Sequence, residues 1–385
     1  MKFCYTLPQY SNESKENFYH IINFLNLLSK QIDLYVVIER SDCHRVNFPY
    51  AKKTVIIEYS KKPYLYRFIK LFITYKYLYR KGVRIFFIRA SLTGLIPLLF
   101  FKKIYRLKNL RSLFWSCGQD VNKILLTPSN KNIKRIISKL IFLFSLRQIN
   151  YLVTGPRTMV NFYAKTYKLD KRKIINLSND ISLERFHPLR LDHKKLKKNE
   201  ILRTNKKVIL FVHTFNYSRG ADILPIFAKK IKDENLNIVL LAIGRKGDYS
   251  NFLEESIEKN NLENILILKN DIPNKDIQNF YQISDIFIMP SRGEGFPRVI
   301  LESMACELAS VCFDVGGVRD ILGSELSKYL VVDELDIDQF IFRAIDLLIN
   351  REKLLGKLSK DSYERVKRYG SSKVVKDYVK ALKRI

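Results

Sequence analysis

A chain of 385 residues with 47% hydrophobic residues is too long for one ordinary hydrophobic core, so it predicts two domains. The five cysteines are scattered and include no C-x-x-C pair, which argues against a disulfide framework or a zinc site and favours a reducing compartment. The formal net charge is +30, and residues 61–150 hold 20 Lys or Arg against one acidic residue, Asp120.

The first half of the chain alternates short apolar runs with helical patterns. Strands are predicted at residues 2–6, 34–38, 55–58, 83–88, 111–115 and 151–154, and helices at 18–28, 64–80, 96–104 and 132–144. Pro97 fits the third of these helices only as part of its first turn. Such alternation implies a parallel sheet covered by helices on both faces.

The same half carries no predicted targeting or spanning segment. Residues 1–7 are one strand-like run followed by Pro8, which does not resemble a signal peptide. The longest uncharged apolar stretch, 90–101, is shorter than the roughly 20 residues that a spanning helix needs. We therefore expect a cytoplasmic location.

Basic residues are interleaved with aromatic and aliphatic residues along the predicted helices at 64–80, 96–104 and 132–144, and also at 105–108. These could be solvated faces of core helices, a surface that binds anionic lipid, or a surface that binds nucleic acid. No RNA-binding aromatic signature or known DNA-binding motif accompanies them. Because apolar and basic residues lie on the same helices, we expect the partner to be an anionic membrane surface and not a nucleic acid.

Residues 189–206 are polar and charged, and they are predicted to link an N-terminal domain (1–188) to a C-terminal domain (207–370). Strands in the second domain are predicted at 208–212, 238–243, 265–268, 286–289, 309–313 and 330–332. Helical patterns lie between them and continue to the end of the chain. The predicted fold class is therefore α/β, with two doubly wound domains.

The most informative stretch is 286–322. Its opening apolar run is typical of a buried parallel strand, a short loop (291–296) follows, and Pro297 stands where a helix would start. Gly293 and Gly295 are expected to adopt angles that other residues avoid and to let the backbone approach a ligand. The N–H groups at the helix start would form an anion site that suits phosphate.

Two carboxylates accompany this anion site. Glu294 lies on the loop and Glu302 lies in the second turn of the helix, so both could line one cleft. Carboxylates beside a phosphate favour a ligand that also offers hydroxyl donors. A nucleotide sugar has these groups, because its diphosphate lies between two hydroxyl-bearing rings.

The pattern E-G-F-P-x-x-x-L-E-x-M-A, followed by a strand and D-x-G-G, resembles the donor-site signature of retaining family 4 glycosyltransferases of the GT-B fold. This resemblance implies that Glu294 contacts the transferred sugar and Glu302 the ribose, with Gly295, Phe296 and Pro297 beside the donor. It also implies two Rossmann-like domains that face each other across a cleft. The last helix, about 371–385, is expected to pack back on the first domain.

The loop after strand 208–212 resembles the family's G-R-x-x-x-x-K-G loop, whose two cations hold the donor diphosphate. Arg219 stands at the lysine position, with Gly220 behind it. Thr214 replaces the expected arginine and His213 replaces the expected glycine, so one cation is missing. Gly244, at the end of strand 238–243, is similar to the family's strand-glycine turn.

Relatives also carry an H-G-x-(E/D) turn in the first domain, on the acceptor side of the reaction. The matching residues here are Cys117, Gly118 and Asp120, with cysteine in place of histidine. The segment 174–188 resembles the family's N-G-(I/V)-D-x-x-x-F segment.

The resemblance implies a metal-independent hexosyltransferase that acts with retention. Its donor would be a nucleotide diphosphate sugar, and its acceptor a hydroxyl of a glycan or lipid-linked molecule in cell-surface polysaccharide or lipopolysaccharide biosynthesis. The enzyme would be peripheral on the inner face of the cytoplasmic membrane. No cofactor is expected, and no metal, because the only Asp-x-Asp (336–338) opens a late helix outside the donor motifs.

Two alternatives remain open. The departures at Cys117 and Thr214 permit a GT-B protein that binds nucleotide sugar without transferring it. The charge alone permits a basic protein associated with nucleic acid, although the donor motif is then unexplained.

Overall fold

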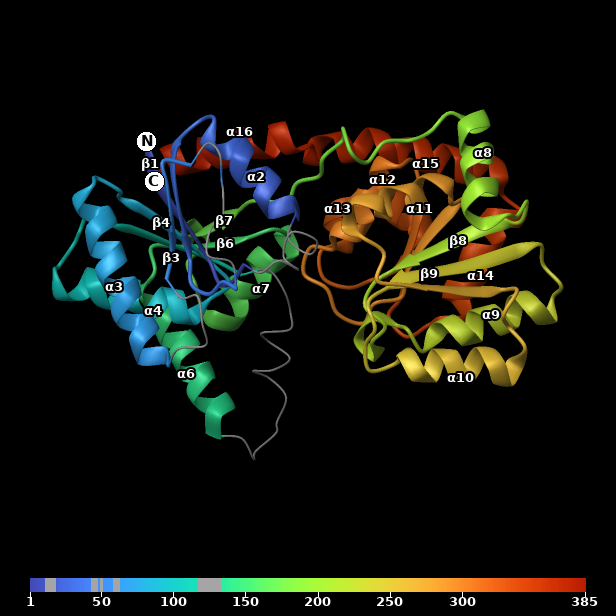
Figure 1. Ribbon diagram of the computed structural model, residues 1–385, viewed down its shortest axis with the longest axis horizontal. Coiled ribbons are helices and arrows are strands. Elements are labelled where there is room, and N and C mark those ends of the chain that lie inside the picture. Colours follow the sequence, from blue (N-terminus) through green and yellow to red (C-terminus); the bar gives the residue numbers. More distant parts are fainter. Residues whose placement is uncertain (11–18, 43–47, 49–50, 58–62, 117–132) are drawn as a thin grey trace. The chain divides into compact units, whose positions relative to one another are not determined.

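The computed structural model describes residues 1–10, 19–42, 48, 51–57, 63–116 and 133–385 (Figure 1). These residues form two α/β units, one of Met1–Asp180 with Ser371–Ile385 and the other of Ile181–Gly370. Each unit contains one sheet, and its described strands all pair in parallel. The parallel α/β architecture predicted for both halves is therefore confirmed.

The first unit is built on a seven-stranded sheet with the order β3-β2-β1-β4-β5-β6-β7. Its strands are β1 (Lys2–Leu7), β2 (Asp33–Ile38), β3 (Lys53–Ile56), β4 (Ile85–Arg89), β5 (Arg111–Trp115), β6 (Tyr151–Thr154) and β7 (Ile174–Asn176). Along β1, Phe3 and Tyr5 enter one hydrophobic cluster while Cys4 enters the other, because successive side chains of a strand point to opposite faces. Both faces of this strand are buried, which explains its nearly continuous apolar sequence.

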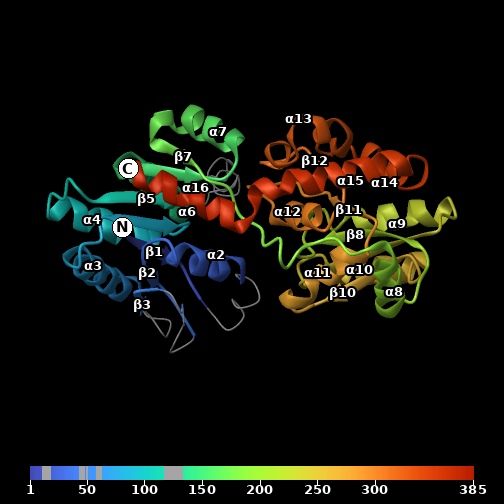
Figure 2. The same cartoon turned by 90° about the horizontal axis from the view of Figure 1, so that it is seen from above.

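Helices cover both faces of this sheet. On one face, α2 (Tyr19–Ser29) and α16 (Ser371–Lys383) lie side by side (Figure 2). Phe24 of α2 and Tyr378 of α16 pack edge to face at 4.8 Å. The C-terminal helix is therefore part of the first unit. The other face carries α3 (Tyr64–Arg80), α4 (Leu92–Ile104), α6 (Ile133–Gln148) and α7 (Arg157–Tyr167). Within the described ranges, no helix has the length and hydropathy needed to cross a membrane.

Helix α4 begins about one turn earlier than the sequence predicts. Ser91 is its N-cap residue, and the Ser91 hydroxyl accepts a hydrogen bond from the N–H of Gly94 at 3.1 Å. This bond satisfies one of the N–H groups that a helix start leaves without an intrahelical partner. Pro97 consequently lies inside the helix and not in its first turn.

The second unit contains a six-stranded sheet with the order β10-β9-β8-β11-β12-β13. Its strands are β8 (Lys207–Val212), β9 (Ile238–Gly244), β10 (Leu266–Asn270), β11 (Ile286–Met289), β12 (Ser310–Phe313) and β13 (Val331–Val332). Its α-helices are α8 (Leu191–Leu202), α9 (Ile223–Asp233), α10 (Ser250–Asn260), α11 (Ile277–Ile283), α12 (Arg298–Ala305), α13 (Val318–Leu330), α14 (Ile337–Ile349) and α15 (Glu352–Val366). The strand order reverses between β8 and β11, and open α/β sheets bind ligands at such a reversal, beyond the carboxyl ends of the strands.

Residues 189–206, which the sequence predicts to be a linker, contain α8, and this helix belongs to the second unit. Lys194 and Lys198 form ion pairs of 3.1 Å with the largely buried Asp285, just before β11. Burial alone would raise the pKa of Asp285, but the charges of the two lysines lower it below its ordinary value. These ion pairs attach α8 to the start of β11.

The chain crosses between the units twice, at residues 180–181 and at residues 370–371. The N–H of Ile181 donates to the carbonyl of Tyr369 at 2.9 Å, and the hydroxyl of Ser371 donates to Oδ2 of Asp180 at 2.6 Å. The boundary of the second unit thus lies at residue 181, inside the segment 174–188, and not after residue 188.

Candidate functional site

The loops that follow β8 and β11 are bound to each other. The N–H of Arg292 donates to the carbonyl of Ser218 at 2.9 Å. Gly220 has a φ of 76°, and a Cβ on it would lie 2.2 Å from the carbonyl oxygen of Pro290. Only glycine fits this close approach. Gly220 therefore sets the spacing of the two loops.

A buried ion pair strengthens the same junction. The guanidinium of Arg292 donates from Nη1 to Oδ1 of Asp222 at 2.7 Å and from Nη2 to Oδ2 at 2.8 Å. Nη1 also donates to the carbonyl of Tyr217 at 2.7 Å, and the guanidinium lies 4.0 Å from the centroid of the Tyr217 ring. Arg292 is not among the site residues predicted from the sequence. In the sequence, the one indication of its role is its position as a cation between a buried strand and the glutamate motif.

Glu294 is the centre of the site. Its Oε1 accepts a hydrogen bond from Nη1 of Arg219 at 2.5 Å and lies 3.3 Å from Nε2 of His213. The Glu294 side chain is 10% exposed, and each partner side chain is 22% exposed. Arg219 Nη1 also donates to the carbonyl of Gly293 at 2.7 Å. The two residues predicted to be catalytic, Glu294 and Arg219, are therefore in direct contact.

His213 is oriented by the backbone. Its Nδ1 accepts a hydrogen bond from the N–H of Thr214 at 2.9 Å, so in the neutral ring the proton resides on Nε2, facing Glu294. Burial alone would raise the pKa of Glu294, but the hydrogen bond from His213 and the charge of Arg219 lower it below its ordinary value. Glu294 is therefore a carboxylate at neutral pH, held by two donors.

Two further glycines bring neighbouring loops against this centre. Gly316, after β12, has a φ of 54°, and a Cβ on it would lie 2.2 Å from the carbonyl oxygen of Glu294. A Cβ on Gly244 would lie 1.8 Å from the carbonyl oxygen of His213. Both glycines permit close packing of backbone on backbone, and Gly244 thereby supports His213.

Gly293 and Gly295 do not behave as the sequence predicts. Within the described part of the chain, the glycines with positive φ are Gly82, Gly220, Gly316 and Gly323. Gly293 and Gly295 are not among them, so neither uses the left-handed backbone region that glycine permits. The carbonyl of Gly295 instead accepts a hydrogen bond from the N–H of Gly317 at 2.8 Å.

Helix α12 starts beside these loops. Pro297 occupies the N-cap position, one residue before the helix, and no side chain caps this end. The N–H groups of the first turn are therefore not used by a capping side chain. Phe296 is buried and packs edge to face on Tyr369 at 5.6 Å, which anchors the loop.

Glu302 lies one turn into α12, where its Oε2 accepts a hydrogen bond from the hydroxyl of Tyr281 at 3.0 Å. Tyr281 is buried on α11, and its pKa is raised well above the ordinary value by burial and by the charge of Glu302. The tyrosine therefore stays protonated and fixes the carboxylate.

The acceptor-side residues predicted from the sequence, Cys117, Gly118 and Asp120, lie outside the described residues. A small cavity in the first unit is lined by Tyr5, His20, Ile21, Phe24, Arg89, Ser178, Asn179, Asp180 and Tyr378. Arg89 ends β4, donates to the Tyr5 hydroxyl at 3.0 Å and stacks 4.2 Å from the Trp115 ring. Arg89 is not among the residues predicted from the sequence, although a cation at the end of a buried strand is a recognisable signal.

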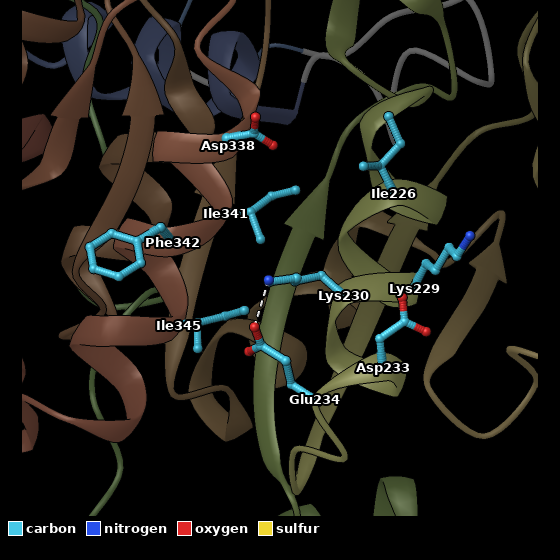
Figure 3. Close-up of a pocket in the computed structure, with 9 residues that line it drawn as sticks. All are labelled: Ile226, Lys229, Lys230, Asp233, Glu234, Asp338, Ile341, Phe342 and Ile345. Atoms are coloured by element: carbon cyan, nitrogen blue, oxygen red, sulfur yellow. Dashed lines mark ion pairs between the residues drawn. The ribbon is translucent and has the colours of Figure 1, made fainter.

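A pocket of about 440 Å³ lies elsewhere in the second unit, between α9 and α14 (Figure 3). Ile226, Ile341 and Phe342 give it apolar walls. Lys230 and Glu234 pair with each other at 2.6 Å across one helical turn. None of the predicted donor-site residues lines this pocket, so its size alone does not make it the functional site.

Residues 192–365 match the model of the glycosyl transferases group 1 family. Over 189 residues the chain is 30% identical to an uncharacterized glycosyltransferase of Haemophilus influenzae, an alignment that covers 48% of this chain and 51% of that protein. Over 248 residues it is 27% identical to UDP-Gal:alpha-D-GlcNAc-diphosphoundecaprenol alpha-1,3-galactosyltransferase of Escherichia coli, covering 62% and 61% of the two chains. The chain thus spans about half to three fifths of these relatives.

Among solved structures, Anabaena HepE in complex with UDP and glucose superimposes with a TM-score of 0.76 at 13% identity, over 100% of both chains. This likeness concerns the fold, and it confirms two Rossmann-like domains of the GT-B type. The segment 192–365 that matches the glycosyl transferases group 1 model contains Arg219, Glu294 and Glu302.

Proposed function

We propose that this protein is a retaining glycosyltransferase that moves a sugar from a nucleotide diphosphate sugar to a hydroxyl of an acceptor. One observation carries the proposal. An ionised, largely buried glutamate, Glu294, is held by Arg219 and His213 at the reversal point of a parallel sheet. This segment also matches the glycosyl transferases group 1 family.

The geometry suggests a division of work. Glu294 accepts hydrogen bonds from hydroxyls of the transferred sugar, and Arg219 binds the diphosphate through its planar fork. The N–H groups at the start of α12 add positive potential for the departing phosphate, with Thr214 and Gly220 lining the same loops. Fixed groups aimed at developing charge usually make the largest contribution to catalysis.

The proposal includes no metal ion and no cofactor. Arg219 and the helix N–H groups supply the positive charge that a metal would otherwise provide. The Asp336 carboxylate has another task, because it accepts a hydrogen bond from the N–H of Gln339 at 3.0 Å and caps α14.

For the acceptor, we propose a glycan or lipid-linked molecule at the inner face of the cytoplasmic membrane, made during cell-surface polysaccharide or lipopolysaccharide synthesis. The printed name of the Escherichia coli relative specifies a diphosphoundecaprenol acceptor, and this supports the acceptor class. The basic and apolar helices of the first unit support it independently.

Incubation of the full chain with a panel of nucleotide sugars tests the function. We expect one family of nucleotide sugars, which share the same nucleoside diphosphate, to raise the melting temperature of the protein. A ligand at 100 times its Kd stabilises the folded state by about 2.7 kcal/mol. One member of that family should also be hydrolysed slowly or transferred. A thermal shift without any turnover, even when acceptor lipids are added, would indicate a nucleotide-sugar binder and not a transferase.

The role of Glu302 can be tested separately. Glu302→Ala should weaken binding of the nucleoside diphosphate by about 5- to 150-fold, because a hydrogen bond to a charged group contributes about 1–3 kcal/mol. Tyr281→Phe is the control, since it removes the supporting hydroxyl while the carboxylate remains. Calorimetry with 2′- and 3′-deoxy nucleotides gives the sharper measurement. The wild type should discriminate against one of them, and Glu302→Ala should not; equal discrimination by both proteins would remove Glu302 from the ribose site.

A further inference from the structure

Helix α3 is apolar on two faces. Leu71, Tyr75 and Leu78 are buried toward the sheet. A second row, spaced by four residues and therefore on one side of the helix, faces the solvent. This row consists of Leu65, Ile69, Ile73 and Tyr77, which are 68%, 49%, 55% and 39% exposed. An ordinary surface helix of a soluble domain is polar on this side.

The neighbouring helices continue this row. α4 packs against α3, where Phe68 and Phe100 lie edge to face at 5.7 Å, and α6 packs against α4 (Figure 1). Among the described side chains of these two helices and the residue after α4, the large apolar ones that are exposed are Phe100, Ile104, Tyr105, Ile136, Ile137, Leu140, Ile141 and Phe144. We call the exposed apolar residues of α3, α4 and α6 the apolar face. A group of exposed apolar residues on three adjacent helices marks an interaction site, unlike single apolar residues scattered on a surface.

The charge around the apolar face has one sign. Residues 63–116 contain 12 Lys or Arg and no Asp or Glu. The exposed cations on and next to α3 and α4 are Lys70, Arg80, Lys81, Lys103, Arg106 and Lys108. Several cations lie against tyrosines: Lys70 is 5.5 Å from the Tyr66 ring, and Lys76 donates to the hydroxyl of Tyr105 at 2.8 Å. Aliphatic residues, tyrosines and cations thus share one surface.

We propose that the apolar face of α3, α4 and α6 inserts into the interfacial region of an anionic lipid bilayer. The Leu, Ile and Phe side chains enter the acyl boundary, the tyrosines lie at headgroup depth, and the lysines and arginines bind lipid phosphates. This inference deepens the proposed membrane location, and it names the surface responsible.

Two other partners fit the observations less well. A nucleic acid would use the cations, but it gains nothing from aliphatic side chains in the middle of a helix. A protein partner usually buries a surface whose centre is depleted of charge and especially of lysine. Here Lys70 lies beside Ile69 and Ile73. An anionic lipid bilayer interacts favourably with both the apolar side chains and the cations.

The test is sedimentation of the full chain with vesicles of phosphatidylcholine alone or with 30% phosphatidylglycerol. We expect binding to the anionic vesicles to be at least about tenfold tighter, because each cation near an anionic surface adds a severalfold increase. A fraction of the binding should also survive high salt, since inserted apolar side chains are not screened.

Ile69→Ser with Ile73→Ser should lower the affinity for anionic vesicles about tenfold and remove the salt-resistant fraction. Leu191→Ser with Leu196→Ser is the control, because these leucines of α8 in the second unit are even more exposed than Ile69 and Ile73; we expect less than about a twofold change. Lys103→Glu, Arg106→Glu and Lys108→Glu together should remove the preference for anionic lipid. Lys102 is left intact because it donates to Asn150 at 2.7 Å and supports the fold.

The thermal shift of each variant with nucleotide shows whether the second unit is intact, independently of lipid binding. Unchanged salt-resistant binding by the double serine variant would overturn insertion. A wild type that ignores lipid would also overturn the proposal. If the wild type forms oligomers and the double serine variant does not, the apolar face joins two copies of the chain. If the wild type binds RNA through the same cations, the partner is nucleic acid.

Discussion

Glu294→Ala is expected to lower the rate of sugar transfer at least about 100-fold, the range seen when one preorganised electrostatic group is removed from an active site. Binding of the nucleoside diphosphate alone should persist or become tighter. The reason lies in the geometry: Glu294 holds the guanidinium of Arg219 at 2.5 Å, so its loss frees this cation for phosphate. Initial rates and calorimetry measure the two effects separately.

Glu294→Gln and two substitutions of Arg219 complete this experiment. Glu294→Gln keeps an acceptor for His213 but removes the charge, so a similar loss of rate shows that the charge matters. Arg219→Ala should weaken diphosphate binding more than Arg219→Lys, and lysine should still fall short of arginine because it lacks the planar fork. Wild-type rates in Glu294→Ala would remove this residue from the mechanism, and equal kinetics for all Arg219 variants would make that residue a surface cation.

The sequence predicted that Glu294 and Arg219 would lie in one site, but it could not predict their contact. Both residues follow parallel strands, and adjacent carboxyl ends of such strands meet at one edge of the sheet. The contact itself depends on how closely two loops approach. That approach is set by the contact of Gly220 with the carbonyl oxygen of Pro290, between residues 70 positions apart.

Helix α8 shows a different limit of prediction. Hydrophobic periodicity is the main sequence signal for a helix, and α8 buries none of its own residues. Its contacts with the second unit include ion pairs of Lys194 and Lys198 with Asp285, about 90 residues further along the chain. A polar stretch of this kind cannot be told from a linker until its distant partner is known.

The apolar face of α3 lies between these cases. The sequence showed interleaved apolar and basic residues, and it left open whether the apolar ones were all buried. Leu71 and Tyr75 are buried while Ile69 and Ile73 are exposed, because the helix meets the sheet along only one of its two apolar rows. The direction of the helix against the sheet decides this, and periodicity alone does not.

Arg292→Ala is expected to give the largest loss of stability, about 3 kcal/mol in the free energy of unfolding of the second unit. Removing one partner of a buried, bidentate ion pair leaves the other charge uncompensated, and such losses are typically about 3–5 kcal/mol. Here Asp222 would lose both guanidinium bonds, and the carbonyl of Tyr217 would lose its donor. Partial exposure of Asp222 places the expectation at the lower end of that range.

The chain offers a matched control for this pair. Arg319 and Asp314 form an ion pair of the same length, 2.7 Å, but the two side chains are 51% and 36% exposed. Arg319→Ala should therefore cost less than about 1 kcal/mol, because solvent screens exposed pairs. Urea unfolding of both variants, with Asp222→Ala and the double variant to complete a cycle, measures the difference. Because Arg292 holds the loop that carries Glu294, its loss should also weaken nucleotide binding, whereas Arg319→Ala should not. If the two arginine variants are equally stable, the junction between the loops is held by the glycine contacts and not by the buried ion pair.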